Sequence, residues 1–179
     1  MIDIIKTVSL SGSGTNKWKF SGDKSGWKRI AVRVELDQRG IDLDTLLCPI
    51  CNDAVELVDH AIYSCKSAKD IWIGIFKWWN LPFPSGATID ELINGTCFTT
   101  SNTNKRKVWQ AIMWVTCYMI WKNRNLKVFK NDSWATPKII CEIQVKSFEW
   151  IQNRSRKPAS TWQQWLMGTN ALDSTFDPG

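Results

Sequence analysis

A cluster of three cysteines and one histidine places the strongest constraint on this 179-residue chain. Cys48 and Cys51 form a Cys-x2-Cys pair. His60, the only histidine in the chain, follows after eight residues, and Cys65 follows after four more. Zinc ions in proteins prefer four cysteine or histidine ligands at the corners of a tetrahedron. The spacing therefore predicts that Cys48, Cys51, His60 and Cys65 hold one structural Zn²⁺.

Two other interpretations of this cluster stay open. The first is a redox-active Cys-x2-Cys pair, although no strand–helix–strand pattern surrounds this one. The second is that the four residues are neighbours by chance. A catalytic zinc site is disfavoured, because four protein ligands leave no open position for water. The remaining cysteines, Cys97, Cys117 and Cys141, lie in apolar contexts and are expected to be small buried hydrophobic residues.

The same spacing constrains the backbone around the site. Residues five apart do not share a face of an α-helix, so we expect the chain to break between His60 and Cys65. A short helix over about residues 55–62, with Cys65 directly before the next helix, would satisfy this condition. Glu56 and Asp59 are candidate hydrogen-bond acceptors for the imidazole.

Apolar residues at helical spacing predict a mainly α protein, in which a small irregular Cys3His zinc unit is followed by a helical bundle. We expect helices directly after Cys65 and over residues 88–94, 104–130 and about 136–154. Ser67 is expected to cap the first of these, and Thr88 the second. The alternation of apolar and charged residues over 30–36 predicts one strand.

These elements indicate five segments. They are a loop-rich leader (1–27), the zinc-binding unit with its following helix (28–82), a linker with a short helix (83–103), a basic, tryptophan-rich helical region (104–168) and a polar tail (169–179). No apolar run is long enough to cross a membrane, and the first residues lack the basic start of a signal peptide. We therefore expect an intracellular protein, nuclear or cytoplasmic, whose cysteines are thiols or metal ligands.

Charge is distributed unevenly over the chain, whose net charge is +6. Residues 35–95 contain ten acidic and four basic side chains, whereas residues 96–160 contain twelve basic and three acidic ones. A basic segment indicates either a polyanionic partner or a solvated face. Because an acidic surface repels phosphate, any contacts with nucleic acid are expected downstream of the zinc unit.

Several motifs around the cluster are those of a known family. They are Arg33, Leu36, Arg39, Gly40 and Ile41 before the cysteines, Glu56 four residues before His60, and Ala68, Trp72, Trp78 and Trp79 after Cys65. Downstream, "IWKNRNLKVF" (120–129) is similar to a Trp-Lys-x-Arg-Asn signature of the same elements. With these motifs, residues 28–168 resemble the reverse-transcriptase zinc-binding domain of plant-type non-LTR (LINE-like) retrotransposons.

The resemblance implies an accessory module of a retrotransposon RNA-directed DNA polymerase. In that family the zinc unit follows the polymerase within a polyprotein, and it would help to hold template RNA or target DNA during target-primed reverse transcription. The chain contains no Asp-Asp dipeptide and no carboxylate cluster suited to the metals of phosphoryl transfer. We therefore expect a fragment of such a polyprotein that lacks the polymerase active site and is not an enzyme.

Basic side chains are the expected contacts with RNA or DNA, since they neutralise phosphates. The candidates are Lys105, Arg106, Lys107, Lys122, Arg124 and Lys127. Arg124 could instead pair with an acidic group. Aromatic residues among them could stack on bases, although tryptophan at helical spacing is more often a core residue: Trp109, Trp121, Phe129 and Trp150. The alternative function is a zinc-stapled structural or protein-interaction module that docks on the polymerase part of the polyprotein and contacts no nucleic acid.

Overall fold

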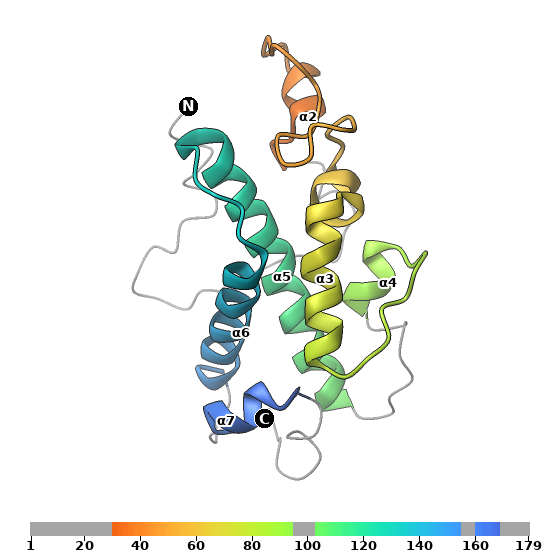
Figure 1. Ribbon diagram of the computed structural model, residues 1–179. Helices are drawn as coiled ribbons and strands as arrows, with labels where there is room; N and C mark the ends of the chain where they lie inside the picture. Colours follow the sequence, from red (N-terminus) through yellow and green to blue (C-terminus); the bar gives the residue numbers. More distant parts are fainter. Residues whose placement is uncertain (1–29, 95–102, 155–159, 169–179) are drawn as a thin grey trace. The chain divides into compact units, whose positions relative to one another are not determined.

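The computed structural model describes residues 30–94, 103–154 and 160–168 (Figure 1). The elements in chain order are α2 (Arg33–Asp37), the π-helical turn η2 (His60–Ser64), α3 (Lys66–Trp78), α4 (Ile89–Asn94), α5 (Thr103–Lys130), α6 (Thr136–Gln152) and α7 (Trp162–Leu166). Over these ranges the structure contains no strand, so the mainly α prediction is confirmed. None of the described helices is both long and apolar enough to cross a membrane. The predicted leader (1–27), the polar tail (169–179) and Cys97 lie outside the described residues.

Helix α5 is the central element of the bundle. It packs against α4, α6 and η2, and α3 packs against η2 and α6 (Figure 1). A helix with neighbours on several sides must be apolar nearly all round. Its buried side chains include Val108, Trp109, Ile112, Met113, Met119 and Ile120.

Three aromatic side chains form the centre of the core between α3 and α5. The Trp109 ring meets Phe76 and Trp79 edge-on, with ring centroids 5.0 and 5.2 Å apart. Its indole N–H donates to the carbonyl of Leu92 at 2.9 Å, which ties α4 to α5. Edge-to-face packing adds stability beyond burial alone. Trp109 is thus a core residue. The apolar side chains at helical spacing in and directly after α3 are also buried: Ile71, Trp72, Ile75, Phe76 and Trp79.

The C-terminal helix α7 docks on the end of α3. Thr161 caps α7 in a reciprocal capping box with Gln164. The indole N–H of Trp78 lies 3.2 Å from the carbonyl oxygens of both Trp165 and Leu166. Gly168 adopts a positive φ of 69°, and a Cβ at this position would collide with the carbonyl oxygen of Trp78. Glycine is therefore required where the chain passes the end of α3.

The helix starts bear out one predicted cap and correct another. Thr88 and Glu91 form the predicted capping box of α4: the Thr88 N–H donates to the Glu91 carboxylate at 2.7 Å, and the Glu91 N–H donates to the Thr88 hydroxyl at 3.3 Å. The predicted Ser67 cap of α3 is wrong. The residue at the N-cap position is Cys65, whose backbone is extended (ψ 134°), and Lys66 is the first helical residue. The helix therefore starts two residues earlier than a cap at Ser67 would require.

The predicted strand over 30–36 is wrong as well, since Arg33–Asp37 is helix α2. A strand needs a neighbouring strand for its backbone groups, and the described residues offer none. The helix satisfies them locally: the Leu36 N–H donates to the Val32 carbonyl at 3.0 Å. At its start the Arg33 N–H donates to the carboxylate of Glu56 at 2.8 Å, which also places a negative charge at a helix N-terminus.

Candidate metal centre

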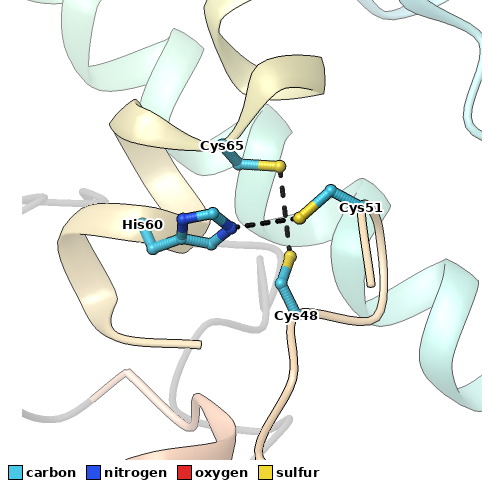
Figure 2. Close-up of side chains that lie close together, drawn as sticks. All are labelled: Cys48, Cys51, His60 and Cys65. Carbon is cyan, nitrogen blue, oxygen red and sulfur yellow. Dashed lines mark hydrogen bonds between the residues drawn. The ribbon is translucent and has the colours of Figure 1, made fainter. Parts of the chain in front are cut away.

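The four predicted ligands come together between η2, the start of α3 and the loop before them (Figure 2). Their ligand atoms all lie within 4.8 Å of one another. The Cys48 and Cys65 sulfurs are 4.0 Å apart, and the Cys51 sulfur lies 3.3 Å from Nε2 of His60. Tetrahedral zinc bonds imply about 3.8 Å between two sulfurs and about 3.6 Å between sulfur and nitrogen. The arrangement therefore fits a single Zn²⁺ held by all four residues.

The cysteine pair lies on a tight hairpin-like knuckle. The Cys48 N–H donates to the Ala54 carbonyl at 2.7 Å, and the Glu56 N–H donates to the Leu46 carbonyl at 2.8 Å. Between these two bonds the chain reverses at Asn52, whose φ is 53°. Asparagine tolerates this left-handed conformation better than most residues. The turn brings the second cysteine back beside the first.

His60 and Cys65 are brought together by a widened helical turn. The Cys65 N–H donates to the His60 carbonyl at 2.8 Å, which closes an i to i+5 turn. The short helix runs from about Val58 to Ser64, later than the predicted 55–62. The predicted break does occur, but at Cys65 itself, where the backbone becomes extended. Such π-helical turns are frequent at functional sites.

Backbone amides surround two of the sulfurs, as expected for a zinc knuckle. The Cys48 sulfur accepts hydrogen bonds from the N–H groups of Ile50 and Cys51. The Cys65 sulfur accepts them from Ser67 and Ala68, in the first turn of α3. These donors stabilise the thiolate form that zinc requires.

The Cys48 thiol donates a hydrogen bond to the Cys65 sulfur, with the two sulfurs 4.0 Å apart. This bond lowers the pKa of Cys65 to about 7. The same bond, with burial, raises the pKa of Cys48 far above the usual range of a thiol. The two cysteines therefore share one proton near neutral pH, and zinc would displace it.

Neither predicted second-sphere carboxylate is hydrogen-bonded to the imidazole in the described structure. Glu56 is completely buried, and its carboxylate accepts from the Arg33 N–H and from the guanidinium of Arg124 instead. Asp59 is exposed at the start of the helical turn. The prediction for Glu56 failed because its side chain is drawn to a buried cation 68 residues away.

The basic candidates for nucleic-acid contact fall into two groups. Arg124 is only 3% exposed, and its guanidinium pairs with Glu56, so it is withdrawn from the candidates. Lys122 lies 3.7 Å from Glu142 of α6 but keeps about 40% of its side chain exposed. Arg106 and Lys107 are exposed, whereas Lys105 and Lys127 are half-buried.

The aromatic candidates divide in a similar way. Trp109 is a core residue, and Trp121 is half-buried. The Trp150 ring is covered by the guanidinium of Arg154, 3.9 Å from its centroid. Phe129, near the end of α5, is 62% exposed. It is therefore the candidate best able to stack on a base.

The other cysteines show one predicted and one unexpected environment. Cys117 is buried in α5, and burial raises the pKa of its thiol, as expected for a core residue. Cys141 is exposed, contrary to prediction. In α6 the buried positions are Ile139 and Ile143, and Cys141 lies between them, about 200° around the helix from each. The segment is apolar overall, so its composition did not indicate that Cys141 is exposed.

Comparison with known proteins agrees with the geometry. Residues 6–72 match the model of the protein family described as zinc-binding in reverse transcriptase. The matched segment is similar to a reverse-transcriptase zinc-binding domain. This segment contains all four ligands and ends within α3, so the resemblance is confirmed over this range. The match begins at residue 6, before the predicted start of the resemblance at residue 28. No curated protein and no solved structure matched the chain significantly.

Proposed function

We propose that the chain is a non-catalytic accessory module of a non-LTR retrotransposon reverse transcriptase, and that it contacts RNA or DNA through α5. The observation that carries this proposal is the closed Cys3His cluster inside a reverse-transcriptase zinc-binding domain. A zinc ion bound by four protein ligands has no open position for substrate. Its role is then to stabilise the fold, and other residues make the contacts.

The basic groups of α5, of which Arg106 and Lys107 are exposed and Lys105 and Lys127 are half-buried, support contact with a polyanion. Lys105, Arg106 and Lys107 follow one another at its N-terminal end, and Lys127 lies near its C-terminal end. Lysine and arginine neutralise phosphates and release counterions, which makes binding strongly dependent on salt. The exposed ring of Phe129 adds a stacking surface for an unpaired base. Single-stranded RNA is therefore the preferred probe.

Fluorescence anisotropy with a labelled single-stranded RNA tests the proposal. We expect affinity to fall steeply between about 50 and 200 mM salt, and to fall at all salt concentrations in Lys105→Ala/Arg106→Ala/Lys107→Ala. The matched control removes three exposed lysines of α3, Lys66→Ala/Lys69→Ala/Lys77→Ala, and should bind nearly as the wild type does. No binding by the zinc-loaded wild type at low salt would refute the proposal.

The surface of the zinc unit supports a second candidate function. Exposed carboxylates lie in the knuckle and on either side of it in the chain: Asp42, Asp44, Asp53 and Asp59. An acidic surface repels phosphate and suits a basic protein partner. In this alternative the module is zinc-stapled and structural, docks on the polymerase part of the polyprotein and contacts no nucleic acid. Equally weak RNA binding by the wild type and by both triple variants would favour it.

A further inference from the structure

A buried ion pair joins the zinc unit to the long central helix. Nε of Arg124 lies 2.8 Å from one carboxylate oxygen of Glu56, and an outer guanidinium nitrogen lies 2.5 Å from the other. The two side chains are 3% and 0% exposed. Two parallel hydrogen bonds of this kind fix both distance and orientation. The pair therefore determines how the knuckle and α5 meet.

On the zinc side, Glu56 belongs to the framework that carries the ligands. Its N–H donates to the carbonyl of Leu46, two residues before Cys48, and its chain continues directly into the turn that bears His60. Its carboxylate also receives the N–H of Arg33 at the start of α2. The Arg33 side chain in turn donates to the carbonyl of Leu47 at 2.9 Å. Movement of Glu56 would therefore displace ligands on both of its sides.

On the helix side, Arg124 lies in the last two turns of α5. The turn η2, which bears His60, packs directly against α5. Beyond Arg124 the helix ends in exposed residues, among them Phe129. Because a buried carboxylate without its partner is strongly destabilising, the knuckle and this end of α5 must be in place together.

We propose that Glu56 and Arg124 are positioning residues of the zinc site, although neither touches the metal. The pair links zinc binding to the docking of the C-terminal half of α5, so each stabilises the other to the same extent. This inference concerns the zinc site and α5 alone and does not depend on nucleic-acid binding. It predicts that a change in the helix weakens metal binding at a site to which the helix contributes no ligand.

Competition with a chromophoric zinc chelator at constant temperature tests this link. Arg124→Met should bind zinc about 10-fold or more weakly than the wild type, the range typical of residues that orient metal ligands. Glu56→Gln/Arg124→Met removes the uncompensated charge and should recover part of that loss. Lys122→Met breaks a partly exposed pair on the same helix and should retain wild-type affinity. Wild-type affinity in Arg124→Met would overturn the proposal.

A second set of measurements separates positioning from a general loss of stability. Gly168→Ala weakens the docking of α7 on α3, far along the chain from the ligands, and should keep wild-type zinc affinity at 25 °C. If it loses zinc as Arg124→Met does, the proposal fails. If Arg124→Met does not fold by circular dichroism, Arg124→Lys serves in its place, because it keeps the charge and loses the two-pronged contact.

Hydrogen exchange followed by mass spectrometry gives the reciprocal readout. Removing zinc from the wild type should speed exchange in the segment around Arg124 before it does so in the segment around Ile112 of the same helix. The Co²⁺-loaded Arg124→Met variant should also show altered absorption bands, since the ligand geometry changes. Uniform exchange along α5 after chelation, with unchanged Co²⁺ bands, would overturn the proposal.

Discussion

The backbone carbonyl of His60 accepts a hydrogen bond from the N–H of Cys65 at 2.8 Å. This turn is one residue wider than an α-helical turn, and it brings the imidazole and the Cys65 thiol to one side of the chain (Figure 2). An α-helical turn would point residues five apart in different directions. Cys65 is also the residue that precedes α3, so the metal cluster and the start of α3 share one residue.

Replacement of a single ligand should abolish stoichiometric zinc. The purified wild type should contain about one zinc ion per chain, and Cys51→Ser should contain much less, because three ligands bind zinc far more weakly than four. Elemental analysis on folded protein measures this directly. Cys141→Ser removes an exposed cysteine outside the cluster and should keep its zinc. A folded wild type without metal would contradict the assignment.

Zinc affinity should fall as the pH falls, and the number of protons released should rise. The hydrogen bond from Cys48 lowers the pKa of Cys65 to about 7. At pH 8 the Cys65 sulfur is mostly thiolate, whereas at pH 6 it is protonated and zinc must displace an additional proton. Calorimetry in buffers of different ionisation enthalpy should detect about one more proton released at pH 6 than at pH 8. A release that does not change with pH would contradict the shared proton.

Alanine at Gly168 should destabilise the protein by about 2–4 kcal/mol, from the positive φ and the collision with the Trp78 carbonyl together. Urea denaturation followed by tryptophan fluorescence measures the loss. Gly86→Ala is the matched control: its φ is 98°, yet a Cβ there would meet no atom within 4 Å. It should lose only about 1–2 kcal/mol. Equal losses would show that the collision is relieved at no cost.

Trp109→Ala should cost about 3–5 kcal/mol, as expected for a large buried aromatic side chain. The change removes the contacts with Phe76 and Trp79 and leaves the Leu92 carbonyl without its indole donor. Chemical denaturation measures the effect. Phe129→Ala, on the exposed end of the same helix, should change stability by less than about 0.5 kcal/mol. A small effect at Trp109 would mean that this ring is not central to the core.

The sequence carries the information for local features, because their determinants lie close together in the chain. The ligand spacing is sufficient to predict the site at Cys48 and its partners, and the period of apolar residues predicts α5 and α6. The partner of Glu56 was not predictable, since Arg124 lies 68 residues away and nothing local specifies the pairing. Alternation over 30–36 was misleading because a period of two indicates a strand only where another strand lies alongside.

The cysteine knuckle and the turn η2, which bears His60, tolerate different changes in chain length. At the knuckle the hydrogen bonds that close the loop lie at Ala54 and Glu56, and Asp53 at its tip is exposed, so an extra residue there could extend into solvent. Between His60 and Cys65 the turn is closed by its own backbone bond, and one added or removed residue would rotate the thiol away from the imidazole. Functional variants of this chain should therefore vary in length at the knuckle tip and keep four residues between His60 and Cys65.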